Sequence, residues 1–336
     1  MIRVGVIGYG YWGPNLVRNF MEVPGSQVIA VSDLLQGRLI QAKQRYPLIR
    51  TTTNHQDLID DPTIDALIIA TPVSTHFTLA LEALKAGKHV LVEKPLTSTS
   101  EQAIQLIAEA KKRARVLMVD HTFVYTGAVK KIKELVTHNE LGEIYYYDSV
   151  RVNLGIFRPD VNVLWDLAVH DLSIMDYVLP FRPRAVSAAG ISHVPHELEN
   201  IAYLTLFFDG PFIAHFHVNW LSPVKVRRTL IGGSRKMIVY DDLEPSEKIK
   251  IYDKGINVNN DSENVYKFLV DYRIGDMLAP HLDLTEALRT EAKHFLRCLE
   301  HGEHPITDGD AGLRVVQILE AASRSMADGG QIKELS

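Results

Sequence analysis

The chain has 336 residues, 46% of them hydrophobic, and a formal net charge of −5 at pH 7. At about 150 residues per domain, this length predicts two globular domains. The acidic balance argues against nucleic-acid binding and against attraction to an anionic membrane. The single cysteine, Cys298, excludes an internal disulfide framework, and its place in a predicted helix predicts a buried apolar role. No apolar run reaches the roughly 18 residues of a membrane helix and no leader pattern is visible, so we expect a cytoplasmic protein.

The first predicted element is a short apolar strand, Arg3 to Gly8, that turns directly into a helix. Gly8, Gly10 and Gly13 place the pattern G-x-G-x-x-G at this turn. In a dinucleotide site the first glycine permits the tight turn, the second lets backbone approach a pyrophosphate, and the third lets helix pack on strand. The context of strand, glycines and helix therefore predicts dinucleotide binding.

A second strand, Gln27 to Ser32, ends in Asp33, about 20 residues beyond the glycine turn. A carboxylate there accepts hydrogen bonds from ribose hydroxyls and repels a 2′-phosphate, and no arginine follows until Arg38. The pattern predicts NAD rather than NADP. The alternative is that Asp33 only caps the next helix.

Strands and helices then continue to alternate, which predicts a doubly wound parallel sheet that ends near residue 120. A capping box of Ser98 and Glu101 is expected to start one of the helices. The expected elements are a strand at Asp65 to Thr71, a helix at Thr75 to Ala86, a strand at Lys88 to Glu93 and a strand at Val116 to Val119.

The sequence Glu93-Lys94-Pro95 ends one of these strands. Carboxyl ends of parallel strands face the ligand crevice, so Lys94 is placed for chemistry, and Pro95 can make the preceding peptide bond cis. The residues expected to contact the cofactor are Gly8, Gly10, Tyr11, Trp12, Gly13, Asp33, Thr71, Pro72, His76, Glu93 and Lys94.

The second domain, residues 121–336, is expected to be an α+β domain with a large, mostly antiparallel open sheet. One face of this sheet would cover helices and the other a partner subunit, which predicts a homo-oligomer, dimer or tetramer. The strands are expected at Ile144 to Val152, Ala185 to Val194, Ile201 to Phe208, Phe212 to Trp220, Lys225 to Gly232 and Arg235 to Tyr240. Helices at Leu284 to His301 and Gly309 to Met326 close the chain, and the last can pack back on the first domain.

Asp166 and His170 lie four residues apart in a predicted helix. That spacing places both side chains on one helix face, where the carboxylate can orient the imidazole. An exposed helix pair without catalytic role is the alternative.

The glycine pattern, Glu93-Lys94-Pro95 and Asp166 with His170 together resemble the Gfo/Idh/MocA family of nicotinamide-dependent sugar and polyol oxidoreductases. The resemblance implies that Lys94, Asp166 and His170 are catalytic. Trp-Asp-Leu-Ala-x-His-Asp from Trp165 is similar to members that act on nucleotide-linked sugars, including UDP-N-acetylglucosamine and UDP-N-acetylglucosaminuronate 3-dehydrogenases. Two segments depart from the family pattern, Val161 to Trp165 and Asp120 to Phe123.

The expected reaction is oxidation of a ring hydroxyl, at carbon 3 of a UDP-linked N-acetylated sugar, or the reverse. His170 is the expected base because an unperturbed imidazole has a pKa near 6.5, while Lys94 would hydrogen-bond the reacting oxygen; the two roles can be exchanged. The residues expected to contact substrate are Lys94, Tyr125, Arg158, Asn162, Asp166 and His170. Tyr125 is equally consistent with a core residue and Arg158 with a solvated loop.

We expect no metal site, because His215 and His217 lack a further ligand at suitable spacing. Three alternatives remain for the function. The nearest is a dehydrogenase of a free sugar or inositol. The others are an NAD-dependent glycosidase and a non-catalytic NAD-sensing regulator on the same fold.

Overall fold

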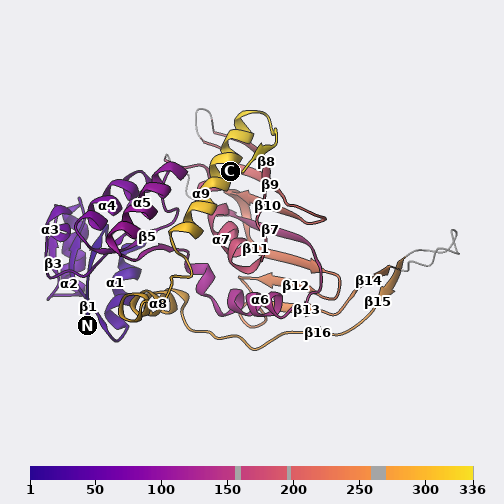
Figure 1. Ribbon diagram of the computed structural model, residues 1–336, viewed down its shortest axis with the longest axis horizontal. Helices are drawn as coiled ribbons and strands as arrows, with labels where there is room; N and C mark the ends of the chain where they lie inside the picture. Colours follow the sequence, from indigo (N-terminus) through magenta and orange to yellow (C-terminus); the bar gives the residue numbers. More distant parts are fainter. Residues whose placement is uncertain (156–159, 195–197, 259–269, 336) are drawn as a thin grey trace. The chain divides into compact units, whose positions relative to one another are not determined.

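The computed structural model describes residues 1–155, 160–194, 198–258 and 270–335. These form two compact units, one of residues 1–126 with 285–320 and one of residues 127–284 with 321–336 (Figure 1). Each unit is built around its own sheet. Among the described helices, none combines the length and apolar character needed to cross a bilayer.

The first unit contains a six-stranded parallel sheet in the order β3-β2-β1-β4-β5-β6, which confirms the predicted doubly wound Rossmann sheet. The strand order reverses between β1 and β4, where such sheets bind their ligands. The strands are β1 (Ile2–Ile7), β2 (Ser26–Ser32), β3 (Arg50–Thr52), β4 (Ala66–Ile69), β5 (His89–Glu93) and β6 (Leu117–Asp120). The central strands are apolar on both faces, because helices cover both.

The helices of this unit are α1 (Gly13–Glu22), α2 (Gln36–Arg45), α3 (Gln56–Ile59), α4 (Val73–Lys85), α5 (Ser100–Arg113), the 3₁₀ turn η1 (Thr122–Tyr125), α8 (Ala287–His301) and the first part of α9 (Gly309–Ala327). The predicted capping box of α5 is wrong by one residue. Thr99 is the N-cap, and its side chain accepts a hydrogen bond from the backbone N–H of Gln102. The extended backbone of Thr99 lets its hydroxyl reach that free donor.

The second unit contains a nine-stranded sheet in the order β16-β13-β12-β11-β7-β10-β9-β8-β17. All its strand pairs are antiparallel except β7 with β10, so the expected mostly antiparallel sheet is confirmed, with one parallel pair that the sequence did not predict. Its strands are β7 (Ile144–Leu154), β8 (Ala185–Ile191), β9 (Ile201–Phe207), β10 (Ile213–Asn219), β11 (Leu221–Gly233), β12 (Met237–Asp241), β13 (Ile249–Tyr252), β16 (Met277–Leu278) and β17 (Lys333–Glu334). A separate hairpin pairs β14 (Gly255–Val258) with β15 (Val270–Arg273).

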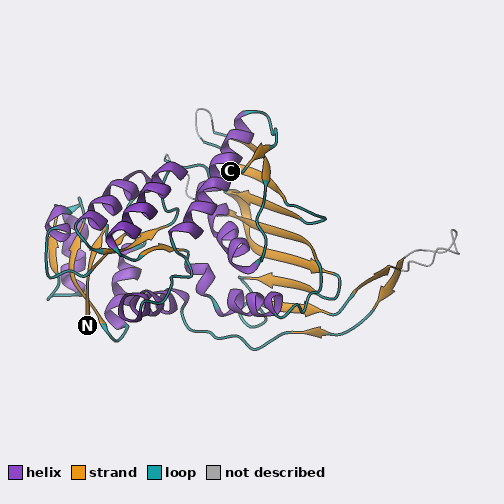
Figure 2. Ribbon diagram, viewed as in Figure 1, coloured by secondary structure: helices purple, strands orange, loops and turns teal. Residues whose placement is uncertain are grey.

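One face of this sheet is covered by α6 (Gly127–Thr137), α7 (Val169–Val178) and the last turns of α9 (Figure 2). Alternate residues of β9 and β10, such as Leu204 and Phe216, are buried beneath these helices, and Ser325 of α9 accepts from the backbone N–H of Ala188 on β8. The intervening residues face the open side, where Tyr203 and Ile213 are each 46% exposed. The sheet therefore has one core face and one open face.

The helix α8 belongs to the first unit, whereas the sequence analysis assigned it to the domain that starts at residue 121. Phe295 of α8 packs edge-on against Phe20 of α1, with ring centroids 6.0 Å apart. Cys298 on the same helix is 2% exposed, as predicted. The apolar side of α8 thus completes the core of the first unit.

Candidate active site

The glycine turn between β1 and α1 requires two of its three glycines for backbone reasons. Gly8 has a φ of +99°, and a Cβ there would lie 2.3 Å from the carbonyl oxygen of Ala70. A Cβ on Gly13 would lie 2.2 Å from the carbonyl oxygen of Gly8. At Gly10 the nearest atom to a Cβ would be 3.6 Å away, on the Arg38 side chain. A Cβ at Gly10 would therefore meet only the end of a flexible side chain at ordinary contact distance, so the fold itself does not require this glycine, and close approach of a pyrophosphate is the role expected for it.

The N-terminus of α1 is also suited to an anion. No side chain caps it, and its first turn contains no acidic residue. The positive end of its dipole therefore remains available for phosphate. Between the glycines, Tyr11 is 89% exposed, while Trp12 turns inward and donates from Nε1 to Oδ2 of Asp120 at 2.9 Å.

Asp33 lies at the carboxyl end of β2 and is 7% exposed. Its Oδ2 accepts from the backbone N–H of Tyr9 at 2.7 Å, and its Oδ1 accepts from that of Leu35 at 2.9 Å. The helix α2 begins only at Gln36 and has no side-chain cap, so Asp33 is not its N-cap. The side chain of Arg38 reaches back to Asp33, with Nη1 3.2 Å from Oδ2. Sequence spacing gave no indication of this ion pair.

The carboxyl ends of β4 and β5 lie beside each other on the far side of the switch point from Asp33. The peptide bond between Lys94 and Pro95 is cis. His76 of α4 connects the two strand ends, since its ring nitrogens contact the carbonyl oxygens of Thr71 at 2.8 Å and Pro95 at 2.9 Å. Burial lowers the pKa of His76. Because its two nitrogens are used in this way, the expected contact of His76 with the cofactor stays a prediction, as do those of Thr71 and Pro72.

Glu93 and Asp120 are register partners on the adjacent parallel strands β5 and β6, so their carboxyl groups lie on the same side of the sheet. Asp120 also accepts a hydrogen bond from the Thr122 hydroxyl. Burial raises the pKa of Glu93 well above its usual range, and the neighbouring Asp120 raises it further. Glu291 of α8 is fully buried and belongs to the same group, because α8 packs against η1, which follows Asp120 in the chain, and burial together with the charges of Asp120 and Glu93 raises the pKa of Glu291. No sequence motif pointed to Glu291.

Tyr125, an expected substrate contact, is 2% exposed in η1. Its hydroxyl lies 3.0 Å from Nδ1 of His294 and 3.2 Å from Oγ1 of Thr307, both in the first unit. These contacts fit the alternative of a core residue, and substrate contact by Tyr125 stays a prediction.

Asp166 and His170 belong to the second unit, in a helix whose first turn is irregular. Residues Leu164–Ala168 form a π turn and α7 follows from Val169. The pair therefore spans a π turn and the start of α7, so the spacing rule for a regular α-helix does not by itself place the two side chains on one face. The carboxylate of Asp166 accepts from Nε1 of Trp220 at 3.1 Å. Trp220 follows β10 and is 2% exposed, and its ring packs so closely on Gly155 that a Cβ there would lie 2.4 Å away.

Asn162 caps the π turn. Its Oδ1 accepts from the backbone N–H groups of Leu164 at 3.1 Å and Trp165 at 3.3 Å, and its Nδ2 donates to Glu199 at 3.0 Å. The expected substrate contact of Asn162 stays a prediction. Arg158, the remaining expected substrate contact, lies outside the described residues.

An ion pair fixes α7 to the sheet directly after His170. The guanidinium of Arg151 on β7 donates to both carboxylate oxygens of Asp171, from Nε at 2.7 Å and from Nη2 at 3.0 Å. Both side chains are almost fully buried. This paired geometry holds the backbone that carries His170 in a defined position.

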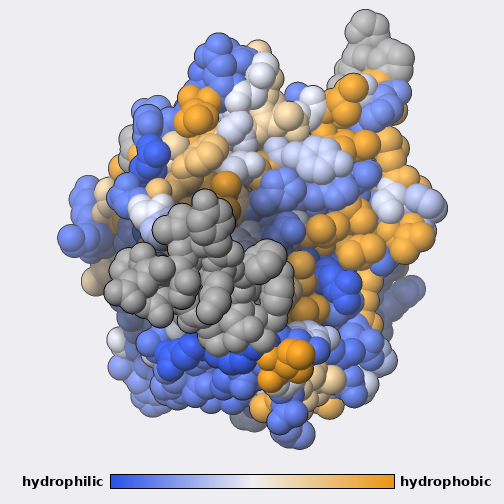
Figure 3. Space-filling model, turned by 90° about the vertical axis from the view of Figure 1, so that its right-hand side faces the viewer, coloured by the Kyte–Doolittle hydropathy of each residue, from blue (hydrophilic) through white to orange (hydrophobic). Residues whose placement is uncertain are grey.

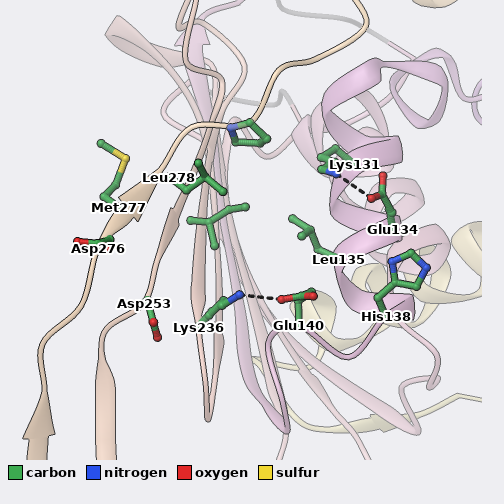
Figure 4. Close-up of a pocket in the computed structure, with 12 residues that line it drawn as sticks. Lys131, Glu134, Leu135, His138, Glu140, Lys236, Asp253, Asp276, Met277 and Leu278 are labelled. Atoms are coloured by element: carbon green, nitrogen blue, oxygen red, sulfur yellow. Dashed lines mark hydrogen bonds and ion pairs between the residues drawn. The ribbon is translucent and has the colours of Figure 1, made fainter.

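A cavity of about 740 Å³ in the second unit lies between α6, β13 and the segment around β16 (Figure 4). Four of its charged side chains form two ion pairs, Lys236 with Glu140 and Lys131 with Glu134, each at 2.7 Å. None of the expected site residues lines it. Within the first unit the expected site residues lie around the strand ends, and within the second unit Asp166 lies in the π turn and His170 near the start of α7.

Comparison with known proteins agrees with these features. Residues 2–121 match a family model described as an oxidoreductase family with an NAD-binding Rossmann fold, and residues 129–239 match the GFO/IDH/MocA C-terminal domain. The uncharacterized oxidoreductase YdgJ of Escherichia coli is 31% identical over 74% of this chain and 73% of its own length. UDP-N-acetylglucosamine 3-dehydrogenase of Acidithiobacillus ferrooxidans is 28% identical, over 94% of each chain. Myo-inositol 2-dehydrogenase of Thermotoga maritima is 24% identical, over 99% of this chain and 98% of its own.

Two solved structures have a fold similar to that of this chain. GenD2 from gentamicin A biosynthesis, solved in complex with NAD, has a TM-score of 0.84 at 24% identity and covers 100% of this chain and 96% of its own. The structure of the Acidithiobacillus enzyme, GnnA, has a TM-score of 0.80 at 25% identity and covers 97% of this chain and 98% of its own. The chain is therefore a member of the Gfo/Idh/MocA family of oxidoreductases, and its N-terminal domain is an NAD-binding Rossmann domain.

Proposed function

We propose that the protein is an NAD-dependent dehydrogenase that oxidises a ring hydroxyl, at carbon 3, of a UDP-linked N-acetylated sugar, or catalyses the reverse reaction. The observation that carries the proposal is the Trp-Asp-Leu-Ala-x-His-Asp segment from Trp165, in which Asp166 lies in the π turn and His170 in the first turn of α7. The relative named as a UDP-N-acetylglucosamine 3-dehydrogenase, which matches over 94% of the chain, supports the substrate class.

The cofactor would be held by the glycine turn, the N-terminus of α1 and Asp33, and when bound it supplies the acceptor for the substrate hydride. His170 then takes the hydroxyl proton, and Lys94 donates a hydrogen bond to the reacting oxygen. Asp166 orients the imidazole of His170. The Asp166 carboxylate is in turn held by a hydrogen bond from the indole N–H of Trp220. Exchange of the roles of Lys94 and His170 would leave the same site residues.

The substrate is tested by turnover. Purified protein with NAD is offered UDP-N-acetylglucosamine, UDP-N-acetylglucosaminuronate, the free sugars and inositol, and nicotinamide reduction is followed. We expect reduction only with the UDP-sugars. Lys94→Ala and His170→Ala should each abolish turnover while NAD still binds. Full turnover in both variants would contradict the proposed roles.

A dehydrogenase of free inositol is the second candidate, because myo-inositol 2-dehydrogenase matches over nearly the whole chain. It predicts reduction of NAD with inositol and no requirement for a nucleotide. A protein that binds NAD but reduces it with no member of the panel would instead fit a sensing role.

We also propose that the protein forms a homo-oligomer through the open face of the nine-stranded sheet. Partly exposed aromatic and apolar side chains on β9 and β10 support this, with Tyr203 and Ile213 each 46% exposed.

A further inference from the structure

The group formed by Glu93, Asp120 and Glu291, which we name the carboxyl cluster, places three acidic side chains together in the interior of the first unit. Asp120 is 2% exposed and Glu291 is fully buried, while Glu93 is partly exposed at the end of β5. Three carboxylates this close and this poorly hydrated cannot all be ionised, because each charge disfavours the others in a medium that screens weakly.

Two side-chain donors near the cluster bond the same member, Asp120, while the backbone N–H of Lys94 donates to Oε2 of Glu93 at 3.2 Å. Trp12 Nε1–H and the Thr122 hydroxyl both donate to Asp120, one to each carboxylate oxygen. Thr122 has a single hydroxyl proton, and Asp120 uses it. By contrast, neither oxygen of Glu291 and not Oε1 of Glu93 receives a hydrogen bond within the described residues. Buried carboxyl oxygens without donors are costly unless the group itself carries a proton and donates.

We propose that Glu93 and Glu291 are neutral carboxylic acids at neutral pH that donate to the Asp120 carboxylate, and that the single charge of this cluster favours the oxidised, cationic form of the bound nicotinamide. Asp120 then accepts from four groups and remains ionised. This arrangement satisfies the buried oxygens and leaves one negative charge instead of three. In the part of the chain that the structure describes, no three such groups are arranged to hold a metal ion, so protons are the species that can neutralise the cluster.

The position of the cluster relative to the cofactor follows from the strand order. Asp33 at the end of β2 marks the adenosine side of the switch point, so the nicotinamide half would lie on the side of β4, β5 and β6. Glu93 and Asp120 are the last residues of β5 and β6 on that side. Trp12, which lies in the glycine turn, donates a hydrogen bond to Asp120. A fixed negative charge on that side stabilises the cationic ring of NAD⁺ but not the neutral ring of NADH. This second half of the proposal rests on the proposed function.

Other titratable groups face the cluster and must be accounted for. The charge of Lys94, which directly follows β5, lowers the pKa of Glu93, against the larger effect of burial. Burial raises the pKa of Tyr125 in η1, and Glu291 adds to the increase. His121 lies next to Asp120 in the chain and is 2% exposed. Burial also raises the pKa of Glu291 well above its usual range, and Asp120 adds to this effect.

The protonation of the cluster is tested without cofactor or substrate. Infrared spectra at neutral pH should show the C=O stretch of protonated carboxyl groups in the wild type, and Glu93→Gln and Glu291→Gln should each remove part of it. Glu300→Gln, at an exposed position of the same helix, is the matched control and should leave the band unchanged. A wild-type spectrum without the band, or a band unaffected by both cluster variants, would overturn the proposal.

Stability against pH gives a second readout. A carboxyl group that is neutral when folded but ionised when unfolded loses its stabilising contribution as pH rises above about 4.3, the unfolded value. The free energy of unfolding of Glu291→Gln should therefore increase relative to the wild type between about pH 5 and pH 9. For Glu300→Gln the difference should stay constant. A constant difference for Glu291→Gln as well would contradict a neutral Glu291.

The electrostatic role is tested by binding alone. In Asp120→Asn the preference for NAD⁺ over NADH, measured as the ratio of their dissociation constants by calorimetry, should fall by about tenfold. An unchanged ratio would refute the influence on the nicotinamide, even if the infrared result holds. If the wild type binds neither form of the cofactor, the proposed function fails while the proton-sharing cluster remains testable by the spectra.

Discussion

We propose that selection between NAD and NADP depends on two side chains, Asp33 and Arg38. Asp33 repels a 2′-phosphate, while the Arg38 guanidinium 3.2 Å away could bind one if the carboxylate were removed. We expect Asp33→Ser to weaken NAD⁺ binding and to strengthen NADP⁺ binding by about tenfold or more. Calorimetric dissociation constants for both cofactors check this. The double variant Asp33→Ser/Arg38→Leu is the control, and its NADP⁺ binding should be no stronger than that of the wild type. If the double variant still binds NADP⁺ more strongly, Arg38 is not the phosphate ligand.

Trp220 is the residue whose importance only the fold reveals. Its indole N–H holds Asp166, and substitution by phenylalanine keeps most of the ring but removes the donor. We expect Trp220→Phe to lower kcat by about tenfold to a hundredfold, with a smaller change in KM, because a hydrogen bond to a charged group is worth about 1.5–3 kcal/mol. Steady-state kinetics on the substrate identified by the panel measure both constants.

Trp165→Phe is the matched control for Trp220→Phe. It removes the same type of donor from an indole that bonds Ser323 at 3.0 Å instead of Asp166. Its kcat should stay close to that of the wild type. Equal losses in the two variants would mean that Trp220 acts through packing and not by holding Asp166.

At the residue scale, the sequence predicted what depends on a local pattern and missed what depends on partners distant in the chain. Gly8, Gly13 and Asp33 occur at a fixed spacing, and the structure shows the close contacts and hydrogen bonds that this spacing serves. Trp220 lies 54 positions from Asp166, and Glu291 comes from a helix far from β5 and β6. No periodicity or motif connects such positions, because only tertiary packing brings them together.

At the scale of elements, the position of α7 depends on the buried ion pair between Arg151 and Asp171. Asp171→Asn leaves a buried guanidinium without its counter-charge, so we expect it to lower the free energy of unfolding by about 3–5 kcal/mol. Urea unfolding measures the loss. Glu134→Gln, which breaks an exposed pair with Lys131 on α6, should cost no more than about 1 kcal/mol. A loss of the same small size for Asp171→Asn would show that the Arg151 pair does not anchor the helix.

The strands and long helices were predictable as elements because their apolar residues repeat with the period of the structure they form, as in β9 and β10. Boundaries were less predictable. The cap of α5 is Thr99 because its hydroxyl, and not that of Ser98, accepts from the backbone N–H of Gln102. The π turn before α7 was not predictable either, since Asp166 and His170 have the same spacing in sequence whether the turn is α or π.

At the scale of the whole molecule, chain order is a poor guide to which unit a segment joins. The length and the change from alternating βα units to successive strands predicted two folding units. No sequence pattern predicts that α8 packs in the first unit. An apolar helix face such as the one that includes Phe295 can pack against any core of suitable shape. Only the packed structure shows that α1 is its partner.

The prediction that the protein forms a homo-oligomer depends on the open face of the second unit's sheet. On it, Tyr203 of β9 stacks on His217 of β10 with ring centroids 4.4 Å apart, and His215 lies 3.2 Å from Asp148 of β7. Figure 3 also shows hydrophobic side chains gathered in a broad band on one side of the view. A sheet face of this kind gains free energy when a second copy covers it, since about 25 cal/mol is released per Å² of apolar surface removed from water.

We therefore expect the wild type to sediment as a dimer or a larger oligomer, and Tyr203→Asp to shift it toward monomer by placing a charge in the apolar interface. Leu48→Asp is the control, because Leu48 is 95% exposed in the first unit and its substitution should leave the oligomer intact. Analytical ultracentrifugation distinguishes the outcomes. A wild type that is monomeric at all concentrations would contradict assembly altogether. An oligomer that Tyr203→Asp leaves unchanged would move the interface to another surface.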